Sequence, residues 1–167
     1  MNFSHAVVVM GVAGTGKTTI GTLLAERMGV AYAEGDDFHP AANVSKMAAG
    51  VPLADADRLP WLDRVGAWAR ERGAAGGVVT CSALKRAYRD RLRGAAPGVA
   101  FVHLEGSREL IGARMRERRG HFMPVALLDS QFAALEGLGR DEYGVTVGVE
   151  GTPEEVVERA VKALREL

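Results

Sequence analysis

Short apolar runs alternate along the chain with longer stretches in which apolar residues recur at helical spacing. A short apolar or β-branched run bounded by glycine, proline or charge is typical of a buried strand, and the longer spacing is typical of an amphipathic helix. Their alternation favours parallel strands joined by crossover helices, so the pattern predicts an α/β fold with one sheet. The predicted strands are residues 6–10, 30–33, 77–81, 99–104 and 145–149.

The predicted helices carry apolar faces that should pack on the sheet. The last helix has the clearest start, with Thr152 as N-cap, Pro153 in the first position and Glu155 in the third, which together form a capping box. The apolar residues expected to face the core are Ile20, Leu23, Leu24 and Met28 in one helix, and Leu127, Leu128, Phe132 and Leu135 in another.

Length and charge narrow the class of protein. A chain of 167 residues fits a single domain, residues 1–167. Lysine plus arginine equals aspartate plus glutamate at 21 each, so no overall field would attract nucleic acid or an anionic membrane. Cys81 is the only cysteine, which excludes an internal disulfide and a cysteine-rich zinc site. The first apolar run is too short for a membrane span or a signal peptide, so we expect a cytoplasmic protein.

A phosphate-binding motif follows the first predicted strand. Residues 11–18 read GVAGTGKT and match G-x-x-x-x-G-K-[ST] between a strand and a helix, the context that this motif requires. The glycines let backbone N–H groups turn toward phosphate oxygens, and the positive end of the helix dipole adds to the attraction. Lys17 would then reach the β- and γ-phosphates, and the Thr18 hydroxyl would ligate magnesium.

An acidic turn complements this P-loop. The guanine-reading N-K-x-D is absent, and the strand at 77–81 runs into Ser82 where many P-loop ATPases place an aspartate. Residues 35–40 read GDDFHP and follow a predicted strand, so they should lie at the carboxyl edge of the sheet beside the P-loop. We therefore predict that Asp36 holds a magnesium-bound water, accepts a proton from a substrate hydroxyl, or does both.

Two further stretches place cations near that edge. Arg58 lies in DRLPW, before a predicted helix, and Lys85, Tyr88 and Arg89 share one face of a helix that begins at a strand end. A charge run of this kind is usually a solvated helix face, but its position after the strand favours a clamp for a carboxylate and hydroxyls.

The stretch at 113–124 reads ARMRERRGHFMP. Arginines near a helix C-terminus are ordinary, because cations suit the helix dipole. Arg114 and Arg118, spaced i, i+4 before a glycine, equally fit a lid that closes over a transferring phosphoryl group. The residues alone leave both interpretations open.

Taken in order, five segments resemble the gluconokinases, which are small P-loop kinases of the shikimate-kinase and adenylate-kinase group. These segments read GVAGTGKTT, EGDDFHP, NVSKMAAGVPLADADRLPWL, CSALKRAYRDRLR and RERRGHF. The resemblance implies ATP- and magnesium-dependent transfer to the 6-hydroxyl of D-gluconate. It also implies a three-layer P-loop fold with a five-stranded parallel sheet of order 2-3-1-4-5, a mobile lid at about residues 116–125, and a homodimer.

The resemblance also assigns individual residues. Lys17, Asp36 and Arg118 are implied as catalytic, and Thr18 and Asp36 as the metal side, the latter through water. Some gluconokinases have aspartate in place of Glu34 and no acid in place of Asp37, so we predict that Asp37 is a turn residue. The implied ATP-binding residues are Gly11, Gly14, Thr15, Gly16, Lys17, Thr18, Thr19, Arg114 and Arg118, and the implied substrate-binding residues are Asp36, His39, Arg58, Lys85, Tyr88, Arg89, His121 and Gln131.

Two other functions fit the same motifs. A kinase of another small acceptor, such as shikimate or a nucleoside monophosphate, would share the cradle and the lid. A nucleotide-gated P-loop binding protein would use ATP to order the arginine-rich stretch for a partner. The other kinase should lack the block from Cys81 to Arg89, and dependence of ADP release on gluconate distinguishes the kinase from the binding protein.

Overall fold

The computed structural model describes residues 5–117 and 125–167. The predicted site residues Arg118 and His121, and most of the predicted lid, lie outside these described residues. Within them, no helix is both long and apolar enough to cross a membrane.

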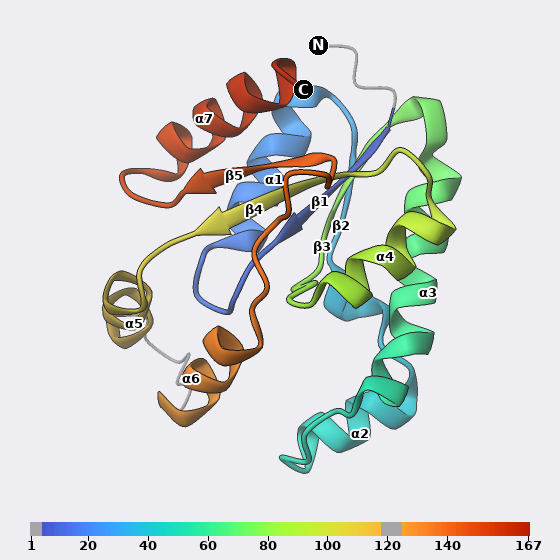
Figure 1. Ribbon diagram of the computed structural model, residues 1–167, viewed down its shortest axis with the longest axis vertical. Helices are drawn as coiled ribbons and strands as arrows, with labels where there is room; N and C mark the ends of the chain where they lie inside the picture. Colours follow the sequence, from blue (N-terminus) through green and yellow to red (C-terminus); the bar gives the residue numbers. More distant parts are fainter. Residues whose placement is uncertain (1–4, 118–124) are drawn as a thin grey trace.

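Five parallel strands form one sheet in the order β2-β3-β1-β4-β5 (Figure 1), which confirms the predicted α/β fold and strand order. All five residues of the central strand β1 are buried, because helices cover both faces of the sheet. A strand buried on both faces is typically a continuous apolar run, as β1 is. The predicted boundaries agree with the observed ones to within a residue or so. The strands are β1 (Ala6–Met10), β2 (Ala31–Ala33), β3 (Gly77–Thr80), β4 (Ala100–Glu105) and β5 (Gly144–Gly148).

Two helices cover each face of the sheet. α1 (Lys17–Met28) and α7 (Pro153–Arg165) pack on one face, and α3 (Asp55–Arg72) and α4 (Arg86–Ala95) pack on the other (Figure 1). Alternate residues of β1 supply the two cores, with Val7 and Val9 on the α1 side and Val8 on the α3 side. The three-layer arrangement therefore follows from the period of two along each strand.

The predicted helix starts and apolar faces are largely confirmed. The Glu155 N–H donates to Thr152 Oγ1 at 3.2 Å, and Glu155 Oε1 accepts from the Thr152 N–H at 3.2 Å, so the predicted capping box is present. Ile20, Leu24 and Met28 are buried as expected. Leu127 is the exception and is 48% exposed, whereas Leu128 of the same helix packs in a small cluster with Val12, Leu84 and Ile111.

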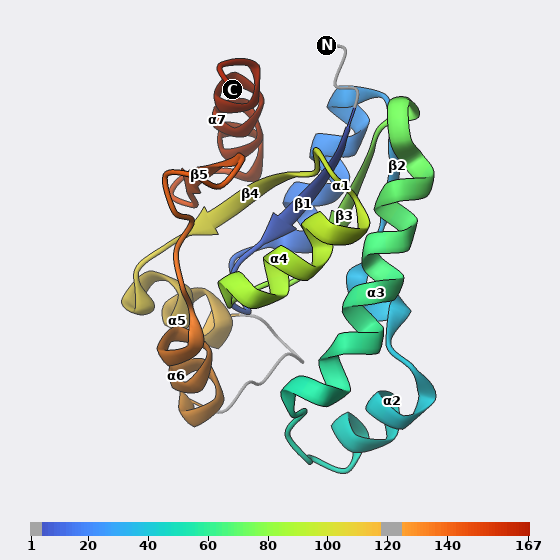
Figure 2. The ribbon, with the colours of Figure 1, turned by 45° about the vertical axis from the view of Figure 1, so that its right-hand side comes forward.

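Three helices lie beyond the carboxyl edge of the strands. They are α2 (Ala41–Ala48), α5 (Arg108–Glu117) and α6 (Val125–Ala134), and Figure 2 shows all three at the same end of the molecule. Two 3-10 turns, η1 (Gly35–Phe38) and η2 (Gly73–Ala75), complete the connections. Because the strands are parallel, the loops that follow β1, β2 and β3 meet at this end, where α/β proteins bind ligands.

Candidate functional site

The P-loop forms a cradle between β1 and α1. Gly14 and Gly16 have φ angles of 83° and 89°, a left-handed backbone that glycine adopts without strain. A Cβ on Gly14 would also lie 2.7 Å from Met115 Cγ, so this position has no room for a side chain. Buried Thr15 donates through Oγ1 to the Val12 carbonyl at 2.9 Å and fixes the loop from within.

Lys17 begins α1 and its ammonium group is bound by the loop itself. Nζ donates to the carbonyls of Gly11 at 2.9 Å and Val12 at 3.0 Å. Burial lowers the pKa of Lys17, and the negative charge of Asp36 is the strongest opposing influence. The acid predicted from the GDDFHP turn therefore acts electrostatically on the P-loop lysine.

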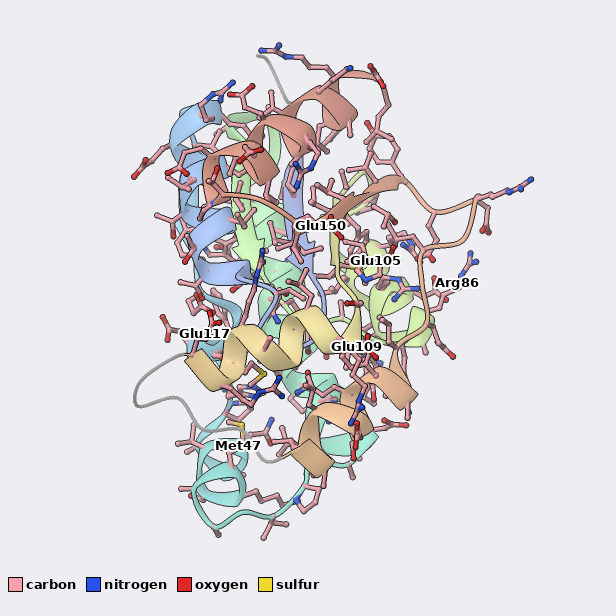
Figure 3. All side chains as sticks on the ribbon, turned by 90° about the vertical axis from the view of Figure 1, so that its left-hand side faces the viewer. Met47, Arg86, Glu105, Glu109, Glu117 and Glu150 are labelled. Atoms are coloured by element: carbon pink, nitrogen blue, oxygen red, sulfur yellow. The ribbon has the colours of Figure 1, made fainter. Side chains whose placement is uncertain are left out.

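A cavity of about 370 Å³ opens on the outer side of the cradle. Arg114 lies at its wall, with NH2 donating to the Gly151 carbonyl at 3.5 Å, and Glu117 lies at the end of α5 (Figure 3). The cavity has the size of a small-molecule site and adjoins the predicted phosphate cradle. Its lining includes three P-loop residues and the start of α7: Gly14, Thr15, Gly16, Thr19, Ile20, Arg114, Glu117, Val149, Gly151, Pro153 and Val156.

Glu34 is the acid that contacts the P-loop hydroxyl, a role that the sequence analysis did not give it. Its Oε2 accepts from Thr18 Oγ1 at 2.9 Å and from the Tyr32 hydroxyl at 2.6 Å, and its Oε1 accepts from Thr80 Oγ1 at 2.9 Å. Burial and the hydrogen bond to Glu34 raise the pKa of Tyr32 to about 12, so the phenol remains a donor. The sequence signal was available, since Glu34 directly follows β2.

The GDDFHP turn is anchored by a glycine and a tryptophan. A Cβ on Gly35 would lie 1.7 Å from the Thr80 carbonyl oxygen, so only glycine fits against the end of β3. Trp61 Nε1 donates to the Gly35 carbonyl at 2.7 Å. Asp36 and Asp37 follow in η1, both exposed, and the Asp36 side chain is 82% exposed. The turn therefore presents its carboxylates to solvent at the edge of the sheet.

His39 is held rigidly beside Asp36. Its ring stacks on Trp61 with centroids 4.3 Å apart and an interplanar angle of 15°, and Asn43 Nδ2 lies 3.2 Å from Nδ1. Nε2 lies 4.0 Å from Asp36 Oδ1. Burial lowers the pKa of His39, which favours the neutral ring at neutral pH.

Arg58, Lys85 and Tyr88 come together around Asp55. The Tyr88 hydroxyl donates to Asp55 Oδ1 at 2.5 Å, and Lys85 Nζ lies 3.7 Å from the same oxygen. Arg58 and Lys85 both approach the Tyr88 ring, at 5.7 and 5.6 Å from its centroid. The sequence had indicated that Arg58 precedes the helix, but Arg58 lies in the first turn of α3. These contacts gather two cations and one tyrosine hydroxyl around the Asp55 carboxylate, a cluster that we call the cationic pocket because its cations outnumber its one acid.

Arg89 does not belong to this pocket, contrary to the single helix face expected for Lys85, Tyr88 and Arg89. Its side chain is fully buried and forms an ion pair with buried Glu142. Lys85 is instead the N-cap of α4, where the chain bends away from the helix path. The substrate-binding role predicted for Arg89 thus lacks an exposed group to carry it.

Gln131 reaches the P-loop from α6. Its Oε1 accepts from the Ala13 N–H at 2.6 Å, so the predicted lid-side residue contacts the nucleotide loop. The remaining predicted site residues, Arg118 and His121, are outside the described part of the chain.

The oxygen groups near Thr18 are compatible with magnesium. Mg²⁺ prefers oxygen ligands, keeps several waters and is usually held by one or two carboxylates together with substrate phosphates. Among residues 5–117 and 125–167, no group of three or more histidine, cysteine, aspartate or glutamate side chains could hold a metal by itself. The Thr18 hydroxyl and the Glu34 carboxylate lie 2.9 Å apart. They fit a Mg²⁺ site in which nucleotide phosphates would supply the remaining oxygen ligands.

Comparison with known proteins relates this site to one family. No family model matches the chain. The chain is 51% identical over 158 residues to a gluconokinase from Gluconobacter oxydans, covering 93% of this chain and 89% of that protein. It is 48% identical over 143 residues to the thermosensitive gluconokinase of Escherichia coli, covering 84% of this chain and 76% of that protein.

Solved structures agree. A gluconokinase from Sinorhizobium meliloti superposes with a TM-score of 0.92 at 44% identity, covering 99% of this chain and 94% of that one. Shikimate kinase from Aquifex aeolicus, at 14% identity and a TM-score of 0.59, shares the fold alone. Because relatives of such high identity match almost end to end, the chain belongs to the gluconokinase family.

Proposed function

We propose that this protein is a gluconokinase, which transfers the γ-phosphoryl group of ATP to the 6-hydroxyl of D-gluconate to give 6-phospho-D-gluconate and ADP. The observation that carries the proposal is the position of the cationic pocket of Arg58, Lys85 and Tyr88 at the same edge of the sheet as the P-loop. Gluconate has a carboxylate at one end and the reacting hydroxyl at the other. An acceptor with both ends therefore suits a site that has cations at one side and a phosphate cradle at the other.

The nucleotide end uses the P-loop and the adjoining cavity. Backbone N–H groups of the loop bind the phosphates, and Arg114 lies in the cavity wall where the nucleoside would sit. Lys17 moves its ammonium from the carbonyls of Gly11 and Val12 to the phosphates when ATP arrives. Thr18, with Glu34 beside it, would hold Mg²⁺, which would supply positive charge against the charge that develops on the transferring group.

The acceptor end uses the GDDFHP turn and the cationic pocket. Asp36 accepts the proton of the 6-hydroxyl while the hydroxyl oxygen attacks the γ-phosphorus of ATP. The bond between that phosphorus and the bridging oxygen breaks, and ADP leaves. His39, fixed on Trp61, limits where the Asp36 carboxylate can lie. Lys85 binds the gluconate carboxylate, and the Tyr88 hydroxyl, whose proton is donated to Asp55, accepts from a gluconate hydroxyl. Arg118 and His121 stay predictions from the resemblance, as do the lid and the homodimer.

A substrate screen tests the function directly. ATP-dependent ADP release is measured with gluconate, other sugar acids, shikimate and nucleoside monophosphates. We expect release to depend on gluconate and the product to carry phosphate at carbon 6. Release with shikimate or a nucleoside monophosphate alone would identify another kinase, and slow release indifferent to every acceptor would favour a nucleotide-gated binding protein.

Lys85→Ala should raise the KM for gluconate about ten- to a hundredfold and change the KM for ATP little. Losing a charge-assisted hydrogen bond to the acceptor typically costs about 1.5–3 kcal/mol. The matched control is Arg91→Ala, because Arg91 is an exposed cation on the same helix that pairs with Asp63 instead. Initial rates over a grid of both substrates provide the two constants. A similar rise in both KM values would remove Lys85 from the acceptor pocket.

Glu34→Gln should raise the Mg²⁺ concentration needed for half-maximal activity by about tenfold, which corresponds to about 1.4 kcal/mol. The amide keeps a hydrogen-bonding oxygen for the neighbouring hydroxyls but removes the negative charge beside Thr18. Glu109→Gln, a change at an exposed acid on α5, is the control (Figure 3). An unchanged magnesium titration in Glu34→Gln would return the metal side to Asp36.

A further inference from the structure

We propose that Arg89 and Glu142 act as positioning residues for the acceptor: together they hold the turn at residues 82–85 in the conformation that presents Lys85 to gluconate. The proposal rests on the proposed gluconokinase function and gives it residues that do not touch the substrate. It also explains why a residue that the sequence assigned to the pocket is buried beneath it.

The turn adopts a backbone conformation that its sequence does not favour. Ala83 has a φ of 44°, and among the described residues it is the single non-glycine residue with a positive φ. A residue with a Cβ occupies this region only where its surroundings impose it. Ala83 is also fully buried, so the constraint comes from packed neighbours and not from solvent.

Arg89 binds the turn directly through NH1, and its other donors fix the guanidinium group in place. NH1 donates to the carbonyls of Ala83 at 2.9 Å and Leu84 at 3.3 Å. Nε and NH2 donate to the two carboxylate oxygens of Glu142, at 2.8 and 3.0 Å, and NH2 also donates to the Gly137 carbonyl at 3.2 Å. The planar guanidinium group makes all five of these hydrogen bonds at once, whereas a lysine ammonium has only three donors.

Glu142 fixes the orientation of this fork. Burial alone raises its pKa, but hydrogen bonds from Arg89, the Gly139 N–H and Arg93 lower the pKa to about 2, so the carboxylate stays charged. Its Oε2 also accepts from the Gly139 N–H at 2.8 Å, which ties the pair to the segment between α6 and β5. Buried ion pairs contribute little net stability compared with apolar packing, so a role in geometry accounts better for this pair.

The same turn is linked to the P-loop and to the segment after α6. The Gly11 N–H donates to the Ser82 carbonyl at 3.2 Å, and the Glu136 N–H donates to the Leu84 carbonyl at 2.7 Å. Glu136 Oε1 accepts from the Arg86 N–H at 2.7 Å, and Figure 3 shows Arg86 beside the segment that leads from α6 to β5. Lys85 lies between these anchors, so its backbone position depends on the turn.

The experiment compares Arg89→Lys with Arg93→Lys. Both changes keep the charge and remove a guanidinium group from Glu142, since Arg93 NH2 lies 2.9 Å from Glu142 Oε1. Only Arg89 contacts the turn carbonyls. We expect Arg89→Lys to raise the KM for gluconate about tenfold, as for one misplaced charge-assisted hydrogen bond, with the KM for ATP changed less than about twofold. Arg93→Lys should lower Tm but leave the KM for gluconate within about twofold of wild type.

An exposed anchor keeps the test decisive if Arg89→Lys does not fold. Glu136→Ala removes the acceptor of the Arg86 N–H from the surface and should raise the KM for gluconate about threefold, and Glu136→Gln, which keeps an acceptor, should restore it. Equal KM changes in Arg89→Lys and Arg93→Lys would overturn the proposal, as would an unaltered KM in Glu136→Ala. Wild-type protein without gluconate-dependent ADP release would overturn the proposed function first, and the positioning role with it.

Discussion

Lys17→Ala should lower kcat by about 10²–10³-fold or more while Tm stays within a few degrees of wild type. The ammonium group stabilises charge on the transferring phosphoryl group, and removing one such preorganised donor typically has an effect of this size. Among the described residues, Nζ hydrogen-bonds to the P-loop carbonyls of Gly11 and Val12 and Lys17 is not part of either core of the sheet, so its loss should leave both cores intact.

Coupled ADP release and thermal melting, measured on the same preparation, check this prediction. Lys162→Ala is the matched control, because Lys162 is an exposed lysine near the end of α7. Wild-type turnover in Lys17→Ala would exclude the P-loop as the phosphate cradle. A loss of turnover that accompanies a collapse of Tm would show a structural role instead.

Asp36→Asn should lower kcat by about 10²–10⁴-fold, the usual contribution of general-base help, whereas Asp37→Asn should change it little. The amide keeps the shape of the side chain but cannot accept the hydroxyl proton. The two residues are a natural matched pair, since both are exposed acids of the same 3-10 turn. Of these two acids, Asp36 is the one that opposes the lowered pKa of Lys17 and approaches His39, at 4.0 Å.

The measurement is kcat for both variants at saturating ATP, magnesium and gluconate, with the affinity for each substrate determined separately. A greater loss in Asp37→Asn would mean that the catalytic carboxylate is the second acid of the turn. A fall in gluconate affinity at unchanged kcat would assign Asp36 to binding and not to proton transfer.

The P-loop was predictable because its requirements are local. Gly14 and Gly16 adopt positive φ angles, and Lys17 and Thr18 follow at the start of α1, so the strand, the turn and the helix are all determined by adjacent residues. The strand order followed from the family resemblance, and the sheet confirms it.

The acids were harder to place, because proximity in sequence does not define the direction of a side chain. Position after a strand indicated that an acid lies beside the P-loop, and the metal-side role of Asp36 stays a prediction. The structure shows Glu34 at Thr18, since Gly35 packs against the Thr80 carbonyl and leaves the preceding residue directed at the loop. Glu34, which contacts Thr18, and Asp36, the predicted acid, are two positions apart in the sequence.

Arg89 shows the limit most clearly. Helical spacing predicted that Lys85, Tyr88 and Arg89 share one face. Residues i, i+3 and i+4 share a face only when all of them lie within the helix, and α4 begins after Lys85. Lys85 is the N-cap with an extended backbone, and Arg89 instead finds a carboxylate 53 residues away in sequence. No local pattern identifies Glu142 as its partner.

By itself, then, the sequence determined the alternation of strands and helices, the phosphate cradle and the apolar faces, because each depends on residues within a few positions of one another. Only the tertiary structure decided which acid lies beside Thr18, which cations share a pocket with Tyr88, and that Arg89 is buried against Glu142. Those choices depend on contacts between distant segments, and in a packed interior the position of one side chain is set by the volume and hydrogen bonds of neighbours that the local sequence does not contain.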